Sequence, residues 1–403
     1  MPALPRTFAA FRHRNYRLWF AGQVVSLMGT WMQTTAQGYL IYDLTRSPAF
    51  LGYVGFAAGA PSWLFMLYGG VAADRFSKRS LLIVTQAVMM LLAFALAGLA
   101  FMGWVRPWHV VALSLLTGVA MAFDAPARQS FVLDMVGRED LTNAIALNSG
   151  MFNLALAVGP AAAGLAYAAF GPAWCFLING ISFLAIIAAL ALMDLPKAEP
   201  APPTPLLEDL KEGVHFTLDH PMIRSLILLI GASTLFGFAI VTLMPAWAVE
   251  VLGGDAKTNG FLLSARGIGA LAGSLIVASV GQRFRGRLLA WGAFSFPVLI
   301  LLFSWQRSLT PALLLVALTG TALILTFNVA NALVQTAAPD RLRGRVMGVY
   351  SLVFFGLAPL GALWIGPAAE ALGEPWAVRV AGLLSLAAAA VLFARAPKLW
   401  SQE

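Results

Sequence analysis

The sequence is short of charge, cysteine and histidine. Asp, Glu, Lys and Arg make up 11% of its 403 residues, against roughly 25% in soluble domains, so much of the surface cannot face water. The only cysteine is Cys175, which excludes an intramolecular disulfide and a cysteine metal site. The four histidines lack metal-ligand spacing, and no G-x-x-x-x-G-K-S/T phosphate loop occurs. We therefore expect no metal, no cofactor and no enzymatic site.

Long apolar runs take the place of charge. Hydrophobic residues make up 60% of the chain, and its mean hydropathy is +0.81. A spanning helix needs about 20 apolar residues to cross a hydrocarbon layer about 30 Å thick. Twelve runs qualify, at residues 18–42, 48–72, 80–103, 108–126, 142–170, 173–193, 224–249, 258–281, 288–306, 310–332, 344–370 and 375–394. Because these runs are continuous, they predict an all-α membrane protein with twelve transmembrane helices rather than a barrel.

The basic residues are distributed unevenly between the predicted loops. If the N-terminus is cytoplasmic, 20 of the 26 Lys and Arg residues fall on the cytoplasmic side and four on the outer side. Positive charge is retained on the cytoplasmic side of membranes, so we expect both termini there. The net charge of +8 then reflects topology and anionic lipid headgroups, and nucleic acid is not an expected partner.

The second half of the chain repeats positions of the first. At an offset of 208, the matched pairs are Gly52 and Gly260, Arg75 and Arg283, Phe76 and Phe284, Arg79 and Arg287, and Leu81 and Leu289. At an offset of 202, they are Gly159 and Gly361, Gly164 and Gly366, Gly171 and Gly373, and Trp174 and Trp376. Ordered matches at constant offsets predict two homologous six-helix bundles with a central cavity between them.

The repeat divides the chain into five predicted parts. They are a cytoplasmic N-terminus at 1–17, the first bundle at 18–193, a cytoplasmic linker at 194–221, the second bundle at 222–394 and a cytoplasmic tail at 395–403. The linker begins with PKAEPAPPTP, which is typical of a stiff, extended chain. Leu206, Leu210, Val214 and Leu218 then recur at helical spacing, which predicts an amphipathic helix on the inner membrane surface.

A charged joint follows the second apolar run, where residues 69–79 read GGVAADRFSKR. A duplicated six-helix chain with G-x-x-x-D-R-x-x-x-R at this joint resembles the major facilitator superfamily. The segments FRHRNYRLWF, FDAPARQSFV and LTNAIALNSGMFN are similar to the enterobactin-exporter-like branch of the drug:proton antiporters, and the likeness runs from Phe11 to Ala394. The resemblance implies a bacterial inner-membrane exporter of small amphipathic molecules, monomeric and driven by a proton gradient.

The resemblance also implies a conformational latch on the inner side of the membrane. Its residues are Gly70, Asp74, Arg75, Lys78, Arg79, Gly344 and Arg345. When the outer side is open, Asp74 would face the helix start at Gly344 and Arg345, where an acid gains roughly 0.3–1 kcal/mol, and Gly70 would allow the helices to approach closely. The basic residues could pair with Asp134, Glu139 or Asp140. The alternative is that these charges only fix the topology.

The fifth predicted span contains AVGPAAAG at 157–164. Proline kinks a helix, and small residues let membrane helices pack closely. The residues Gly159, Pro160 and Gly164 resemble the fifth-helix motif of exporters, which favours efflux over uptake.

Polar residues inside spans are costly and usually functional. The candidates for the wall of the cavity are Gln33, Gln37, Asn153, Asn328 and Asn331. Gln33 and Gln37 share a helix face, as do Asn328 and Asn331. The alternative is that these amides bond to neighbouring helices.

Four charged residues are candidates for proton or ion binding. Asp124 and Arg128 are four residues apart and can pair directly, either for proton coupling or as a structural ion pair. Arg266 could attract an anionic cargo, hold a carboxylate or extend outward to water. Asp43 ends the first span at the outer face, where it could accept protons or stay hydrated.

Two further functions remain open on the sequence alone. One is uptake or exchange of solutes, and the other is a membrane sensor or assembly partner without transport. The intact repeat and joint argue against a sensor, and no signalling domain is attached.

Overall fold

The computed structural model describes residues 6–195, 206–280 and 284–395, apart from the side chains at 6, 7, 66, 67, 74 and 206–209. This part of the chain forms helices and turns, with no strand. The first half contains η1 (Arg6–Arg12), α1 (Arg14–Thr45), α2 (Pro48–Gly59), α3 (Pro61–Arg75), α4 (Lys78–Phe101), α5 (Pro107–Phe170) and α6 (Pro172–Ala191). The second contains α7 (Leu206–Asp219), α8 (Pro221–Ala232), η2 (Ser233–Gly237), η3 (Phe238–Leu243), α9 (Met244–Ala246), η4 (Trp247–Val251), α10 (Ala256–Ser279), α11 (Arg285–Phe303), α12 (Leu309–Ala337), α13 (Arg343–Leu372) and α14 (Glu374–Arg395).

Several predicted spans differ in their bounds from the helices observed. The span at 48–72 is divided into α2 and α3, because Pro61 starts a new helix and proline cannot continue the old hydrogen-bond ladder. The spans at 108–126 and 142–170 both lie in α5, which is non-helical at Gly137, where φ is 69°, a value that glycine tolerates. Nine segments of the described chain are long and apolar enough to cross a membrane, so twelve passes remain a prediction.

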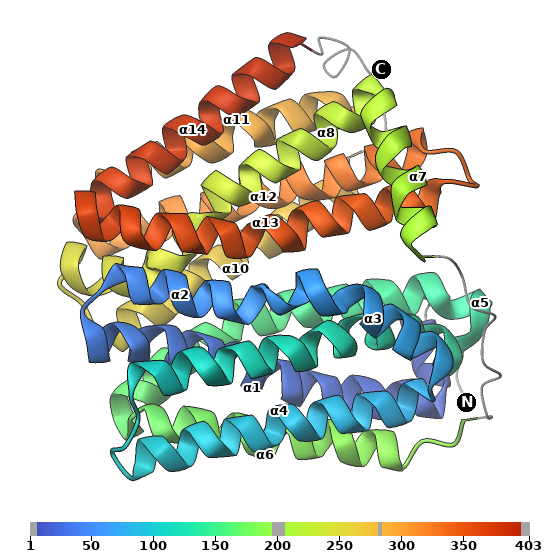
Figure 1. Ribbon diagram of the computed structural model, residues 1–403, viewed down its shortest axis with the longest axis horizontal. Helices are drawn as coiled ribbons and strands as arrows, with labels where there is room; N and C mark the ends of the chain where they lie inside the picture. The colour runs from blue at the N-terminus through green and yellow to red at the C-terminus, as the bar shows by residue number, and fades with distance from the viewer. Residues whose placement is uncertain (1–5, 196–205, 281–283, 396–403) are drawn as a thin grey trace.

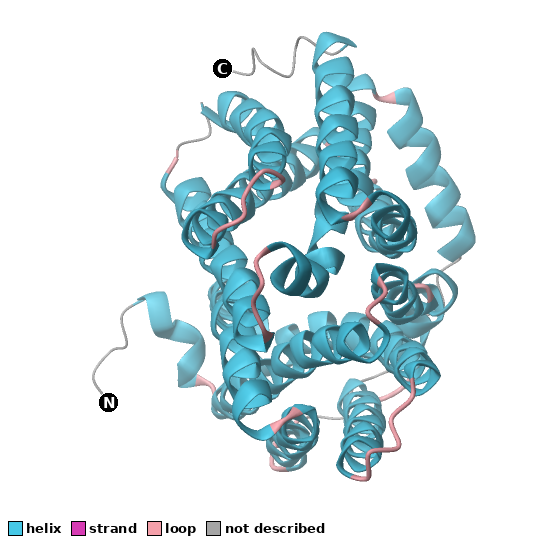
Figure 2. Ribbon diagram, turned by 90° about the vertical axis from the view of Figure 1, so that its left-hand side faces the viewer, coloured by secondary structure: helices cyan, strands magenta, loops and turns pink. Residues whose placement is uncertain are grey.

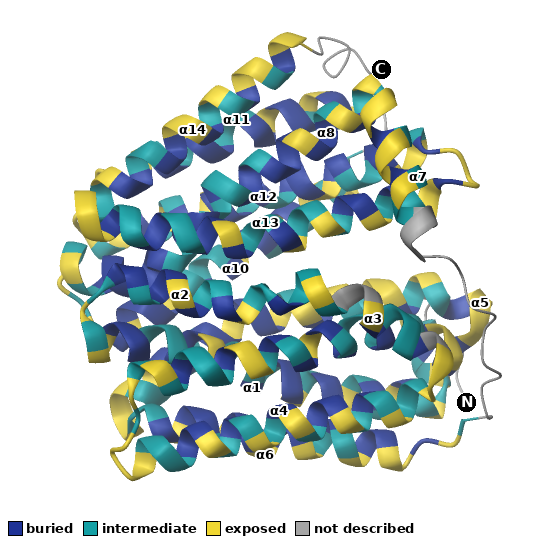
Figure 3. Ribbon diagram, in the orientation of Figure 1, coloured by how far each residue is buried: buried dark blue, intermediate teal, exposed yellow. Residues whose placement is uncertain are grey.

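The surface of the helix bundle is suited to lipid. Large apolar side chains are exposed on the outer helices, among them Leu91 of α4, Leu184 of α6 and Leu383 of α14. Figure 3 shows exposed positions along these helices. Five exposed tryptophans lie near the same ends of the helices, at Trp104, Trp108, Trp174, Trp305 and Trp376. Tryptophan collects at the membrane–water interface. The protein is therefore a multi-pass membrane protein, and these tryptophans mark one interface.

The two halves of the chain form two groups of helices that face each other. Figure 1 shows α1–α6 in one group and α8–α14 in the other, and Figure 2 shows the same helices end-on. The start of α1, the end of α14 and the whole of α7 lie at one end of the molecule (Figure 1). We call this end the terminal face and the end with the five tryptophans the opposite face.

Glycines join the two halves toward the opposite face. A Cβ atom on Gly52 of α2 would lie 2.6 Å from the carbonyl oxygen of Ala362 in α13, and Gly260 of α10 packs directly on the carbonyl oxygen of Pro160 in α5. Gly52 and Gly260 are the pair at an offset of 208, and their partners are 202 residues apart. The repeated glycines therefore make the same interhelical contact twice, once on each side of the molecule.

Polar contacts close the opposite face further. The Tyr42 hydroxyl donates to Glu250 at 2.8 Å, and the backbone amide of Ala49 at the start of α2 donates to Glu370 of α13 at 3.1 Å. Glu370 thus caps a helix of the other half, where a carboxylate is favoured. The two halves meet at the opposite face in this conformation.

The halves lack this close contact at the latch glycines of the terminal face. A Cβ atom on Gly70 or Gly344 would have no neighbouring atom within 4 Å. The close helix approach expected at Gly70 belongs to the outward-open state, so this conformation does not test it and it stays a prediction. The adjacent Gly69 packs instead on the carbonyl oxygen of Ala122, inside its own half.

Candidate functional site

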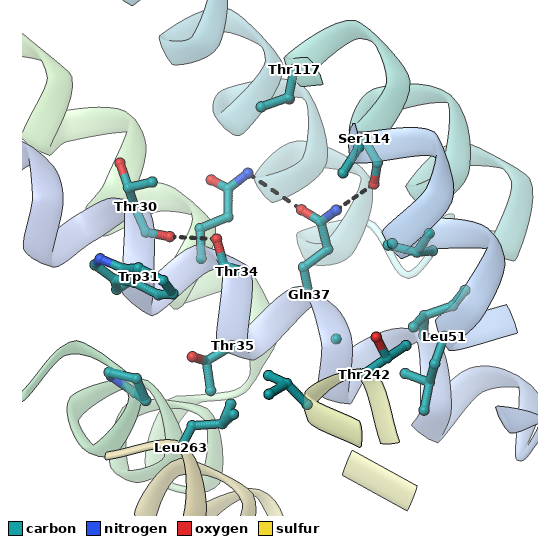
Figure 4. Close-up of a pocket in the computed structure, with 18 of the residues that line it drawn as sticks. Thr30, Trp31, Thr34, Thr35, Gln37, Leu51, Ser114, Thr117, Thr242 and Leu263 are labelled. Carbon is teal, nitrogen blue, oxygen red and sulfur yellow. Dashed lines mark hydrogen bonds between the residues drawn. The ribbon is translucent and has the colours of Figure 1, made fainter. Parts of the chain in front are cut away.

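A cavity of about 420 Å³ lies between the two halves. Its walls come from α1, α2, α4, α5 and α6 of the first half and from η3, α9 and α10 of the second. The residues contributed by α1 lie between Thr30 and Ile41, in the middle and toward the opposite face of that helix. Figure 4 shows side chains of both halves around this space. The cavity therefore occupies the position expected of a central binding site.

A row of hydrogen bonds runs along the first-half wall of the cavity. The Asn179 amide donates to Gln33 at 2.7 Å, Gln33 donates to Gln37 at 3.4 Å, and Gln37 donates to the Ser114 hydroxyl at 2.6 Å. The bond from Gln37 to Ser114 joins α1 to α5 (Figure 4). The amides thus both bond to neighbouring helices and line the cavity. The two interpretations of Gln33 and Gln37, as cavity wall and as links between helices, are therefore compatible.

The other predicted wall residues lie elsewhere. Asn153, Asn328 and Asn331 are not among the residues that line the cavity, and Asn331 accepts a 2.6 Å hydrogen bond from Gln335 of its own helix. They do not line this cavity in the observed conformation, and their role in binding cargo stays a prediction.

The structure adds hydroxyl groups that the sequence did not single out. They come from Thr30, Ser114, Thr117 and Thr242. Thr30 lies on α1 next to the amides, so helical spacing could have found it. Thr242 comes from the other half, and only the folded chain brings it to this wall (Figure 4).

Asp124 is fully buried, and both of its carboxylate oxygens accept hydrogen bonds. Its carboxylate accepts from the Thr85 hydroxyl and the Gln86 amide of α4, each at 2.8 Å. Arg128, one turn further along α5, donates from Nε at 2.9 Å and also from Nη2. The predicted pairing of Asp124 with Arg128 is therefore present within α5, and the bonds from Thr85 and Gln86 join α4 to α5.

The two remaining ion candidates have different surroundings. Arg266 lines the cavity, and the Phe238 ring lies 5.5 Å from its guanidinium carbon. It does not extend outward to water, which excludes that alternative for this conformation. Asp43 is exposed at the opposite face and pairs with Arg46 at 3.0 Å.

The charged joint forms contacts within the first half. Lys78 pairs with Asp134 at 2.9 Å, one of the predicted pairings, whereas Arg79 donates to the Ala191 carbonyl at 2.6 Å rather than to an acid. Asp140 is occupied by Arg12 and His13. The Asp74 side chain lies outside the described part, so its predicted contact with α13 is not tested.

Glu212 of α7 binds the latch residue Arg345. Its carboxylate forms ion pairs with Arg345 and, at 3.0 Å, with Arg341. A Cβ atom on Gly213 would lie 2.7 Å from the Arg345 carbonyl oxygen, so the helix lies directly on α13. The amphipathic helix predicted to lie on the membrane surface thus also covers the start of α13, where Asp74 was expected.

Glu212→Gln is expected to loosen α7 from α13. The pair is partly exposed, with 39% of the Glu212 side chain accessible, so its loss should cost at most about 1 kcal/mol. Amide hydrogen exchange of residues 210–219 should rise by up to about fivefold. Glu139→Gln, which alters a 92% exposed carboxylate, is the matched control. Equal exchange in both variants would contradict a role for Glu212 in holding α7.

Pro160 and Gly164 of the fifth-span motif lie at the junction between the halves, whereas Gly159 packs inside the first half. Gly159 packs on Trp31 of α1, and a Cβ atom on Gly164 would lie 2.5 Å from the Ala256 carbonyl oxygen of α10. Beside Pro160, the Ala161 amide donates to the Ser264 hydroxyl of α10 at 2.8 Å. The motif therefore forms the α5 side of the contact that closes the opposite face.

Two facing helix groups around a central cavity define a membrane transporter of the major facilitator class. Comparison with known proteins agrees. Residues 5–402 match the family model described as transmembrane secretion effector. The chain belongs to this family of major facilitator transporters, whose members are not enzymes.

Several curated proteins are similar over most of their length. The multidrug efflux pump Tap of Mycolicibacterium fortuitum is 26% identical over 86% of this chain and 87% of its own. The enterobactin exporter EntS of Escherichia coli is 26% identical over 93% and 91%. The staphyloferrin A transporter of Staphylococcus aureus is 22% identical over 94% and 95%.

Solved structures support the same fold. A POT family transporter is 12% identical over 96% of each chain, with a TM-score of 0.75. A bacterial homologue of the human lysosomal transporter Spinster is 15% identical over 99% of this chain and 98% of its own, with a TM-score of 0.72. At these identities the likeness establishes the fold alone.

Proposed function

We propose that this protein exports small amphipathic molecules across a bacterial inner membrane by alternating access. The bundles at 18–193 and 222–394 rock about the central cavity, each conformation opening it to one side. The chain acts as a monomer, with both termini in the cytoplasm. The main support is the cavity itself, which lies between halves that meet at one face and stay apart at the latch glycines of the other.

The orientation of the protein in the membrane determines the side to which the cavity opens. The predicted cytoplasmic side carries 20 of the 26 basic residues, and the terminal face would be that side. The observed conformation is then closed to the outside and ready to receive cargo from the cytoplasm. The relatives named above as exporters and efflux pumps support export rather than uptake.

The lining of the cavity fits the proposed cargo. Its volume lies in the range of about 300–1,000 Å³ typical of small-molecule sites. Most of its wall is apolar, with amides and hydroxyls gathered on the α1 side. Such a wall suits molecules with a large apolar part and a few polar groups, including drug-like compounds and siderophores.

Proton antiport is the proposed source of energy. Asp124 is the candidate carrier within the bundle, because protonation would disturb its bonds to Thr85, Gln86 and Arg128. Asp43 is the candidate at the outer face. No additional cofactor is needed for a transporter driven by a proton gradient.

Everted membrane vesicles test the proposal. Vesicles containing the protein should accumulate the dye Hoechst 33342 when a proton gradient is imposed, and a protonophore should abolish this accumulation. Uptake by right-side-out vesicles instead would indicate an importer, and absence of flux for dyes, siderophores and antibiotics would favour a sensor. Dye accumulation that is the same with and without the protonophore would rule out proton antiport.

Asp74→Asn is expected to leave membrane insertion intact and to shift the protein away from the outward-open state. An acid at a helix N-terminus contributes roughly 0.3–1 kcal/mol, enough to change that equilibrium by up to about fivefold. Maleimide labelling of a cysteine in the cavity, applied from the outer side, would measure the shift. Unchanged labelling and transport would show that the charge serves only topology.

A further inference from the structure

Arg266 of α10 is the only charged residue among the described residues that line the central cavity. The wall near it is apolar and includes Leu263, Phe238 and Val241. Arginine stays protonated at physiological pH. The cavity therefore contains a permanent positive charge in a wall that is otherwise neutral.

The Arg266 guanidinium has no counter-ion in the described structure. Its Nε atom is buried without a hydrogen-bond partner. The guanidinium carbon lies 5.5 Å from the centre of the Phe238 ring. An aromatic ring stabilises a cation less than a hydrogen-bonded carboxylate does. Buried charges are normally paired, and no acidic side chain of the described residues pairs with this one.

The backbone around Arg266 is fixed by close contacts on two sides. A Cβ atom on the adjacent Gly267 would lie 2.5 Å from the Leu156 carbonyl oxygen of α5. Gly320 of α12 packs directly on the carbonyl oxygen of Arg266 itself. A side chain held on a rigid backbone loses less freedom when it binds a ligand. Arg266 is thus positioned before any cargo arrives.

We propose that Arg266 binds the acidic group of an anionic, amphipathic cargo, with a carboxylate as its best match. The planar guanidinium can donate two parallel hydrogen bonds to such a group. The apolar wall would hold the hydrocarbon part, and the row from Asn179 to Ser114 would bond to polar atoms. The inference rests on the proposed function in treating the bound anion as the exported molecule.

Two probes that differ only in the acidic group test this proposal. The purified full-length chain in detergent is titrated with 1-pyrenebutyrate and with 1-pyrenebutanol, and binding is followed by quenching of tryptophan emission, since Trp31 lines the cavity. The wild-type protein should bind the carboxylate about tenfold more tightly than the alcohol. Arg266→Gln should bind both equally, and Arg266→Lys should keep part of the preference. Lys257→Gln, at an exposed position on the same helix, should keep all of it.

The outcomes separate this inference from the proposed function. Equal affinity of the wild-type protein for both probes overturns the inference without any variant, as does a preference that survives in Arg266→Gln. Unchanged binding of the alcohol by Arg266→Gln shows that the variant is folded. A preference lost in that variant supports the inference even if vesicles accumulate no dye. Dye export without any preference leaves the proposed function standing and rejects the anion site.

Discussion

Gly260→Val is expected to reduce transport at least about tenfold and to leave the opposite face open. Gly260 packs directly on the Pro160 carbonyl oxygen, and a Cβ atom there would also lie 3.1 Å from the Gly164 Cα atom. A valine must push α10 away from α5. Overpacking costs about 1–3 kcal/mol, which shifts an equilibrium between two conformations by about 5- to 150-fold.

Cysteine labelling measures this shift directly. The single cysteine, Cys175, is buried and can be replaced by alanine, after which Thr242→Cys places a thiol on the cavity wall. A membrane-impermeant maleimide applied from the opposite face should react faster in Gly260→Val than in the parent. Gly98→Val is the control, because the nearest atom to a Cβ there is Met102 Cε at 4.0 Å. Slow labelling and normal transport in Gly260→Val would show that this contact does not control closure.

The contact between Gly52 and Ala362 should control closure of the opposite face as the contact of Gly260 does. Gly52 meets Ala362 as Gly260 meets Pro160, so Gly52→Val should also expose the thiol. If only one of the two variants changed labelling, the two sides of the molecule would not be equivalent in closing the face.

Asp124→Leu is expected to destabilise the folded protein by about 3–5 kcal/mol. The substitution removes the acceptor for Thr85, Gln86 and Arg128 at once and leaves the arginine without its carboxylate. Breaking a buried ion pair by removing one member has this cost. Thermal unfolding of the purified protein in detergent should show a clearly lower midpoint than for the wild type.

The matched control is Thr85→Val, which removes a single donor from the same carboxylate. Its expected cost is about 1 kcal/mol, because Gln86 and Arg128 still bond to Asp124. If Asp124→Leu were as stable as Thr85→Val, the network would contribute little to the fold. A normal midpoint combined with transport that no longer responds to the proton gradient would identify Asp124 as a proton carrier instead.

The sequence predicted those features of the structure that depend only on residues close together along the chain. Apolar runs of membrane length predicted the helices, and Asp124 and Arg128 were expected to pair because residues four apart on a helix are neighbours. The repeated glycines predicted duplication, although not the contact that they make. Two polar residues on the same face of a helix did not by that alone predict a position in the cavity wall. Gln33 and Gln37 reach the cavity, whereas Asn328 and Asn331, at an equally regular spacing, do not line it.

The chain's composition, apolar runs and repeat alone determined that this is a helical membrane protein with two repeated halves, because these properties depend on how residues follow one another. The major facilitator family was implied by the resemblance of the charged joint and was then shown by the match to the family model. Tertiary structure decided which side chains share a space: that Arg266 lies in the cavity without a counter-ion, that Glu212 holds Arg345, and that the halves meet at the opposite face. These outcomes depend on how each helix is rotated and which distant helix it meets. Residues more than 300 positions apart, such as Ala49 and Glu370, come into contact only after the two halves have packed together.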